Sequence, residues 1–122
     1  MTRKYVDQSK QFWVPNAILM PTMSLEGANG GCFMLGNIAP KICRKIIKLG
    51  LNGKFAEAKK INDNLVDLDW NILSRRAAGI KYALDLLGFT GGEPRKPLGS
   101  LSEIDKKIIK DSLNSSGINE VE

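Results

Sequence analysis

The chain has 122 residues, of which 43% are hydrophobic and 25% are charged, and it carries a formal net charge of +5. This balance predicts one ordinary soluble domain that buries its own core, and it excludes a disordered chain. Its apolar runs are too short for a membrane span and its polar start lacks a signal-peptide pattern, so we expect a cytoplasmic protein without membrane contact.

The first predicted elements are short. Residues 12–14 favour an extended segment that Pro15 ends, and residues 17–27 favour a short helix in which Pro21 either lies in the first turn or bends the helix. Glycines at 30 and 31 then predict a turn, and the unalternated apolar run 32–35 is typical of a strand covered on both faces. The expected order is therefore a strand, a helix and a second strand.

Four helices are predicted after these strands. Pro40 suits the first turn of a helix over 41–50 that has Gly50 as its C-cap. Apolar residues at steps of three and four predict one long amphipathic helix over 55–73 and another over 77–88, which Gly88 caps. The Ile80, Ala83, Leu84 and Leu87 side chains of the latter should point inward.

The last predicted helix follows a loop over 89–99 that is rich in glycine and proline. Ser100 and Glu103 have the spacing of a capping box, so the helix should begin there and end near Gly117. Its expected inward residues are Ile104, Ile108 and Leu113.

The glycines near residue 30 do not predict a phosphate-binding loop. Such a loop lies between a strand and the following helix, so that loop amides and the helix N-terminus face the anion. Here the glycines precede the predicted strand, and the GxGxxG spacing and the Walker lysine are both missing.

Two cysteines, Cys32 and Cys43, lie within apolar segments, and the sequence contains no histidine. Neither cysteine has a second one nearby, so no metal set is formed. We therefore expect two reduced, packed thiols, and neither a metal nor another cofactor.

Basic residues gather at helical spacing at Lys41, Arg44, Lys45 and Lys48, whereas lysines elsewhere alternate with acids. Clustered positive charge binds nucleic acid through counterion release. A solvated helix face explains the same pattern more simply, so we do not expect nucleic acid as the main partner.

Two separated motifs carry a resemblance to a known family. A glycine turn, a short apolar run, Asn37 and Pro40 follow one another in the first motif. The second has the pattern G-x-K-x-A-L-x-x-x-G followed by R-x-P-L, and it comprises Gly79, Lys81, Ala83, Leu84, Gly88, Arg95, Pro97 and Leu98. On these motifs, residues 17–118 resemble the C-terminal part of the dihydrodipicolinate synthase / N-acetylneuraminate lyase family of class I pyruvate aldolases.

The resemblance implies a mainly α fold with a small β component. This fold would be the C-terminal fragment of a (β/α)₈ TIM barrel together with the C-terminal helices of the family. Residues 1–50 would then be the remnant of the last βα units of the barrel, and residues 51–122 the C-terminal helical region. A closed barrel needs eight strands and about 250 residues, so this sequence cannot form one alone.

The resemblance also implies a site to which this chain contributes little. The lysine that forms a Schiff base and its tyrosine partner lie on earlier strands of the family, outside the match, so we expect no catalytic residue here. Lys81 belongs to a helix motif and should be structural. Cys32 matches the position whose backbone carbonyl lies near substrate, although Cys-Phe replaces the family's aliphatic-Ser pair and VPNA (14–17) replaces a turn of small and acidic residues.

Three functions remain open. The first is the C-terminal portion of an aldolase, a carbon–carbon lyase acting on pyruvate and related 2-keto acids, inactive alone and completed by an N-terminal barrel half in trans. The second is a non-catalytic helical remnant or oligomerisation module, and a homo-oligomer is typical of the family. The third is a basic nucleic-acid-binding module.

Overall fold

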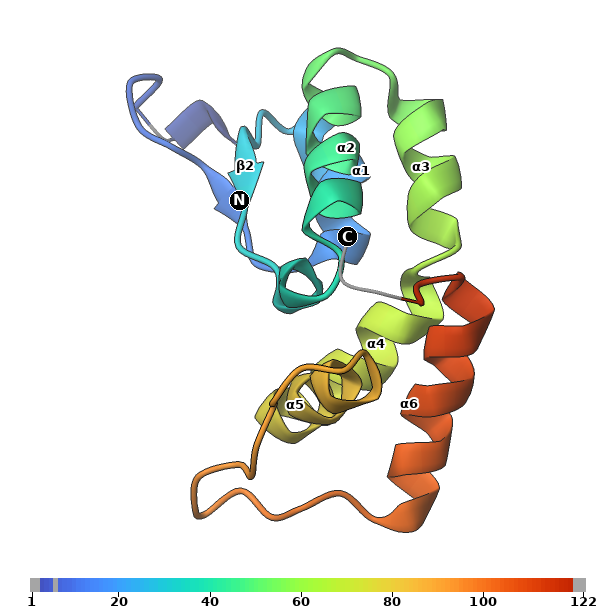
Figure 1. Ribbon diagram of the computed structural model, residues 1–122. Helices are drawn as coiled ribbons and strands as arrows, with labels where there is room; N and C mark the ends of the chain where they lie inside the picture. Colours follow the sequence, from blue (N-terminus) through green and yellow to red (C-terminus); the bar gives the residue numbers. More distant parts are fainter. Residues whose placement is uncertain (1–2, 6, 120–122) are drawn as a thin grey trace.

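A computed structural model describes residues 3–5 and 7–119 of the chain. The fold is mainly helical, with one pair of very short strands (Figure 1). In chain order the elements are η1 (Arg3–Tyr5), β1 (Trp13–Val14), η2 (Ala17–Leu19), α1 (Met20–Leu25), β2 (Gly30–Gly31), η3 (Met34–Asn37), α2 (Pro40–Leu51), α3 (Phe55–Asp63), α4 (Val66–Ser74), α5 (Arg76–Leu86) and α6 (Glu103–Ser116).

Figure 1 shows two groups of helices. Helices α1, α2 and α3 pack together in the upper part of the view, with the strand pair beside them, and α4, α5 and α6 pack together below. Helix η3 joins the groups, since it contacts α2 on one side and α4 and α5 on the other. No helix in the described residues is long and apolar enough to cross a membrane.

The extended segment at 12–14 is confirmed, but the second strand lies earlier than the predicted 32–35. Gly30 and Gly31 themselves form β2, which runs parallel to β1. The backbone N–H of Cys32 continues the pairing by donating to the Val14 carbonyl at 3.0 Å, and the chain then turns into η3. A Cβ on Gly30 would lie 2.8 Å from Nε1 of Trp13, so glycine stands in this strand because an indole covers it.

The predicted helix over 17–27 is present as η2 followed directly by α1, with Pro21 in the first turn of α1. The prediction that Gly50 caps the next helix is wrong, because α2 continues to Leu51. Gly50 is buried, and a Cβ there would collide with the side chain of Ser24 on α1. Gly50 therefore allows α1 and α2 to approach closely, and Gly53, with a φ of +72°, makes the turn instead.

The single long helix predicted over 55–73 is two helices, α3 and α4. The break follows the run Asn62-Asp63-Asn64, whose short polar side chains compete with helical hydrogen bonding. Asn62 is buried and its Nδ2 donates to the Ile18 carbonyl at 3.1 Å, which ties the end of α3 to η2. The apolar spacing runs through the break because both helices face the same core.

Helix α5 has the predicted inward face, with Ile80 and Ala83 buried and Leu84 and Leu87 packed against the core. The cap by Gly88, at a φ of +85°, is also confirmed. At the start of this helix, a Cβ on Gly79 would lie only 2.6 Å from the carbonyl oxygen of Ile72. The first glycine of the second motif thus lets α5 pack directly on the backbone of α4.

Helix α6 begins two residues later than the capping-box prediction. Its N-cap is Ser102, whose Oγ accepts from the Asp105 N–H at 3.1 Å. This shift leaves Ile104 in the first turn beyond the core, where it is 73% exposed, so the prediction that it points inward is wrong. Ile109 is fully buried in its place, while the C-terminal turn at Gly117, with a φ of +75°, is confirmed.

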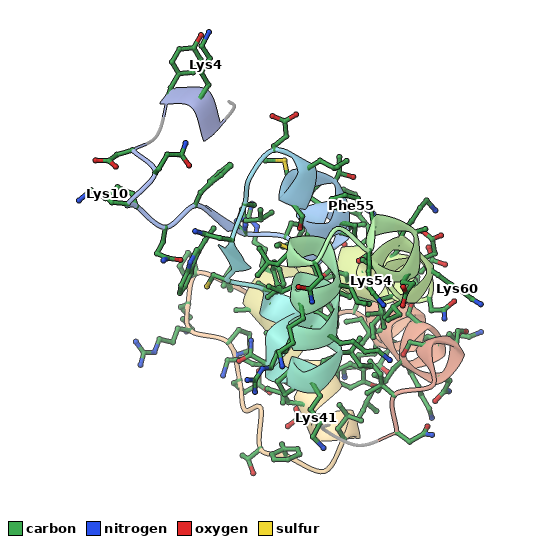
Figure 2. The ribbon with its side chains drawn as sticks, turned by 90° about the horizontal axis from the view of Figure 1, so that it is seen from above. Lys4, Lys10, Lys41, Lys54, Phe55 and Lys60 are labelled. Carbon is green, nitrogen blue, oxygen red and sulfur yellow. The ribbon has the colours of Figure 1, made fainter. Side chains whose placement is uncertain are left out.

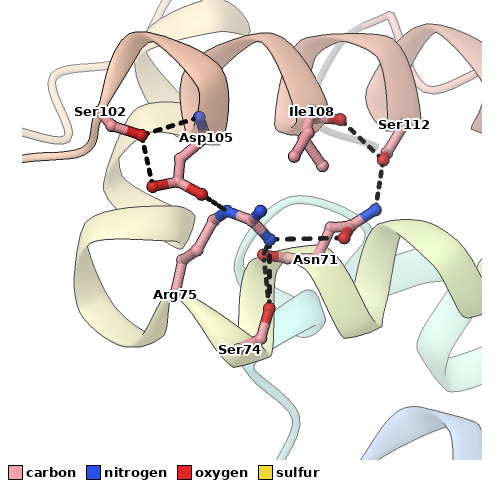
Figure 3. Close-up of polar contacts among 7 residues, drawn as sticks. All are labelled: Asn71, Ser74, Arg75, Ser102, Asp105, Ile108 and Ser112. Atoms are coloured by element: carbon pink, nitrogen blue, oxygen red, sulfur yellow. Dashed lines mark hydrogen bonds and ion pairs between the residues drawn. The ribbon is translucent and has the colours of Figure 1, made fainter.

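A polar network joins α4 to α6 (Figure 3). Nε of Arg75 donates to Oδ1 of Asp105 at 2.7 Å, and Nη1 of Arg75 donates to the Asn71 carbonyl at 3.0 Å. Two turns further along α6, Ser112 accepts from Nδ2 of Asn71 at 2.7 Å. Arg75 has only 17% of its side chain exposed, so this network fixes α6 against α4.

Candidate functional site

The carboxyl ends of the two parallel strands form the candidate site. Trp13 pairs with Gly30 and Val14 with Gly31, so both strands run in the same direction and end at the same edge. Asn29 fixes this register, because its side-chain oxygen accepts from the Phe12 N–H at 2.8 Å. Catalytic groups of parallel barrels come from the segments that follow such carboxyl ends.

The strand pair has one covered face and one open face. Val14 is 3% exposed and belongs to the core, whereas Trp13, the residue before it, is 57% exposed. Successive side chains of a strand alternate between faces, so Trp13, Gly30 and Cys32 share the open face. In a closed barrel this open face is the interior face.

Cys32 lies immediately after β2, at the carboxyl edge of the strand pair, and its role as a substrate-contacting residue stays a prediction. Its thiol is free and exposed. The neighbouring ring of Phe33 packs over Gly31 and against the core. The segment thus presents a thiol on the open side and an aromatic ring on the covered side.

Lys81 does not belong to this site. Its Nζ donates to the Gly91 carbonyl at 2.6 Å, and Asp85, one turn further along α5, accepts from the Gly91 N–H at 2.7 Å. Both side chains therefore fasten the loop after α5, which is a structural role. Tyr82 packs against the core, and Tyr5 is 74% exposed with Lys4 over its ring.

Asp69 is a buried polar residue that our sequence analysis missed. It is 3% exposed, and its Oδ2 has no hydrogen-bond partner among the described residues. Burial raises the pKa of Asp69, and the backbone N–H of Ile18 opposes this rise in part. The signal was present in the spacing, since residue 69 lies four after Leu65 and three before Ile72, at a core position of α4.

The Cys43 thiol lies near Asp69 and is unreactive. Burial, followed by the nearby Asp69 carboxyl, raises the pKa of this thiol to about 11. A nucleophilic cysteine needs the opposite shift, so Cys43 is a packing residue. In the part of the chain that the structure describes, no group of three or more His, Cys, Asp or Glu side chains could hold a metal ion.

The fold and the site together define the class of protein. In this class, parallel strands are joined through a helix and are followed by helices that pack outside them. Solved structures of complete enzymes share this arrangement. A crystal structure of a dihydrodipicolinate synthase superposes with a TM-score of 0.85 at 28% identity, covering 93% of this chain and 40% of that one. Dihydrodipicolinate synthase from Aquifex aeolicus gives a TM-score of 0.87 at 23% identity over 98% of this chain and 41% of that one.

The sequence comparisons agree with the structural ones. The model of the Dihydrodipicolinate synthetase family matches residues 2–116, so the chain belongs to this family. It is 36% identical over 94 residues to the 4-hydroxy-tetrahydrodipicolinate synthase of Afipia carboxidovorans, a match of 76% of this chain and 32% of that protein. The enzyme of the same name from Brachyspira hyodysenteriae is 34% identical over 102 residues, which is 83% of this chain and 34% of the relative.

The family resemblance drawn from the two motifs is therefore confirmed, as is the prediction of a mainly α barrel fragment. The chain spans about a third of the length of the curated relatives that it matches. It is a fragment of an aldolase-family fold, with the carboxyl edge of two barrel strands and the helices that follow them.

Proposed function

We propose that this chain supplies the closing part of a class I aldolase barrel and is inactive without the remainder. Residues 1–50 provide the last βα units, and residues 51–122 provide the helices outside the barrel. The observation that carries this proposal is the strand pair itself: among the described residues, β1 and β2 pair only with each other. Open parallel edges require further strands, and a barrel of this class has eight.

In the completed barrel, the reaction begins with a lysine from the missing segment. A lysine held unprotonated attacks the C2 carbonyl of a 2-keto acid such as pyruvate, and water leaves as the Schiff base forms. The carbonyl of Cys32 lies at the rim and contacts this substrate. We place the assembly, as a homo-oligomer, in the cytoplasm, where the free thiols of Cys32 and Cys43 stay reduced.

The test is to produce the chain together with a segment that supplies the first barrel strands. That segment is taken from a neighbouring reading frame or from the part of the Afipia carboxidovorans relative that precedes the match. We expect co-purification, covalent trapping of pyruvate by borohydride on the added segment, and slower labelling of Cys32 once the open face is covered.

Two controls make the result decisive. The chain alone should trap no pyruvate, because Lys81 bonds a loop carbonyl, and Lys59, which borders the groove between α1 and α3, is exposed and pairs with Asp63. Replacing the Schiff-base lysine of the added segment by alanine should abolish trapping while preserving the complex. A stable complex that traps no pyruvate, or two segments that never associate, would disprove the proposal.

A non-catalytic oligomerisation module is the second candidate, and one feature favours it. An apolar groove of about 390 Å³ lies between α1 and α3, and its lining includes Ile18, Pro21, Leu25 and Phe55. Leu25 is 64% exposed at its edge. If a second copy of the chain covers this groove, light scattering should report a dimer that Leu25→Asp converts to a monomer; a monomeric wild-type chain rejects this candidate.

A further inference from the structure

One exposed face of α2 is uniformly basic. Four basic residues occupy one face at positions i, i+3, i+4 and i+7, all exposed: Lys41, Arg44, Lys45 and Lys48. We call them the basic ridge. The opposite face of the helix packs into the core through Cys43, Ile46 and Gly50, so the ridge points away from the fold.

Nothing on α2 neutralises the ridge. The helix contains no acidic residue, and none of the four side chains takes part in an ion pair within the described residues. By contrast, Lys54 on the next loop pairs with Glu57, and Lys106 on α6 pairs with Glu103. Like charges at i, i+3 and i, i+4 repel one another, so the ridge destabilises the isolated helix.

The ridge also borders a hollow. An open concavity of about 390 Å³ is lined by its four side chains together with Leu49 and Asn52. Its lining thus combines cationic heads, one apolar side chain and one amide. Figure 2 shows Lys41 on the opposite side of the view from Lys4 and Lys10, which lie on the projecting N-terminal segment, so the N-terminal lysines do not extend this surface.

We propose that the basic ridge docks an acidic helix of a partner protein. The four charges span about 10 Å along the helix axis, because each residue rises 1.5 Å. A partner helix with glutamates at i, i+3, i+4 and i+7 presents carboxylates at the same period, and an apolar residue between them meets Leu49. Charge complementarity of this kind steers association and fixes register.

Two other anionic surfaces fit less well. Single-stranded nucleic acid is held by aromatic side chains that stack on bases, and the hollow has no aromatic residue in its lining. A flat membrane surface reaches the charged heads but not the floor of a concavity. The proposal is independent of the barrel proposal, since it concerns the chain alone.

The experiment uses a helical peptide with glutamates at i, i+3, i+4 and i+7 and one leucine among them. A scrambled peptide of equal composition, a 12-nucleotide oligothymidylate and phosphatidylserine vesicles are the comparison probes. We expect the patterned peptide to bind at least about 10-fold more tightly than the scrambled one, with an affinity that falls as salt rises.

Two matched variants locate the binding. Replacing Lys41, Arg44, Lys45 and Lys48 by glutamine should weaken peptide binding at least about 10-fold. The control replaces four exposed lysines outside α2 by glutamine, at positions 60, 96, 107 and 110. It lowers the net charge equally and should change the affinity less than about 2-fold.

Several results would overturn the proposal. These are equal losses in both variants, equal binding of the patterned and scrambled peptides, or tighter binding of the oligonucleotide or vesicles than of the patterned peptide. The comparison of the peptides on the wild-type chain decides the matter even if the ridge variant fails to fold.

Discussion

Helices α4, α5 and α6 pack on one another within the core, whereas the β1–β2 pair leaves a face and both edges open in the part of the chain that the structure describes. In the helical group, Leu68, Ile72 and Ile109 are at most 1% exposed, and the Arg75 network links α4 to α6. In the strand segment, by contrast, Trp13 is 57% exposed although it lies in a strand.

The difference shows which interactions this chain forms by itself. Helices bond their own backbone and need only an apolar partner face, which a neighbouring helix supplies. Strands need other strands, and a two-stranded sheet alone is marginal in water. The helical group is therefore well packed, while the strand segment keeps unpaired edges and an open face among the described residues.

The largest expected effect tests the packing of the helical group. Replacing Ile72 by alanine should lower the free energy of unfolding by about 2–5 kcal/mol, because the side chain is fully buried between helices. Urea denaturation followed by circular dichroism measures the loss. The matched control is Ile104→Ala, since Ile104 is 73% exposed; it should change stability by less than about 0.5 kcal/mol. Equal losses would mean that α6 packs in another register.

Thiol reactivity compares the open strand segment with a buried position on α2. At pH 8 only about one part in a thousand of the Cys43 thiol is ionised, given a pKa of about 11, and the group is buried. Cys32 is exposed on the open side of the strands. A thiol reagent should therefore modify Cys32 at least about 100-fold faster than Cys43.

Cys32→Ser should remove the fast phase and leave only the slow one, and adding urea should then make Cys43 react quickly. Two fast phases in the native wild-type chain would contradict the closed packing around α2.

Two glycines sharpen the comparison further. An alanine at 79 would place its Cβ 2.6 Å from a backbone oxygen of α4, which cannot move without shifting the helix. We expect Gly79→Ala to destabilise the chain by about 1–3 kcal/mol, despite the higher helix propensity of alanine. At Gly30 the obstacle is the exposed indole of Trp13, which can swing away, so Gly30→Ala should cost less than about 1 kcal/mol. Urea denaturation of the two variants side by side gives the ranking, and a reversed ranking would refute this account.

Asp69 is a buried carboxyl group within the apolar packing of the helical group, and the pH dependence of stability tests its effect. Its pKa is raised in the folded state, so the folded chain binds this proton more tightly than the unfolded chain does. Its contribution to stability is therefore complete below the unfolded pKa of 3.8 and is lost as pH rises through the raised folded pKa.

At neutral pH, Asp69→Asn should raise stability, by up to about 1–3 kcal/mol if the amide finds partners. It should also flatten the decline in stability between acidic and neutral pH. Asp67→Asn, on the exposed side of the same helix, is the control and should change stability by less than about 0.5 kcal/mol at neutral pH. An identical pH slope for wild type and Asp69→Asn would show that Asp69 is not the group responsible.

The sequence predicted the structure correctly where a pattern depends only on residues nearby in the chain. Apolar spacing predicted α2, α5 and α6, and the glycine caps at 88 and 117 were correct because a left-handed turn is a local requirement. The two motifs identified the family, although they did so through resemblance and not through packing.

The predictions were wrong where a contact with a residue distant in the sequence determines the local structure. Gly50 resembles a cap in sequence, but it is small because Ser24 lies against it. Gly30 and Gly31 resemble a turn, yet they are a strand that aromatic rings cover. The roles of these glycines depend on tertiary contacts that spacing does not contain. Asp69 is a different case, because its spacing marks a core position and only its polar side chain made that position look exposed.

The smallest expected effect concerns the start of α6, where the predicted cap was two residues early. Ser102 accepts from the Asp105 N–H, and its own hydroxyl donates to Oδ2 of Asp105 at 2.7 Å, so the two side chains cap the helix together. Ser102→Ala should lower stability by about 1 kcal/mol, the usual cost of losing an N-cap.

Ser100 is the matched control, because it bonds the exposed Glu93 and caps nothing. Ser100→Ala should change stability by less than about 0.5 kcal/mol in the same urea titration. If Ser100→Ala were the more damaging change, α6 would begin where the sequence pattern placed it. The Arg75–Asp105 contact would then need a different geometry, since it depends on Asp105 lying in the first turn of the helix.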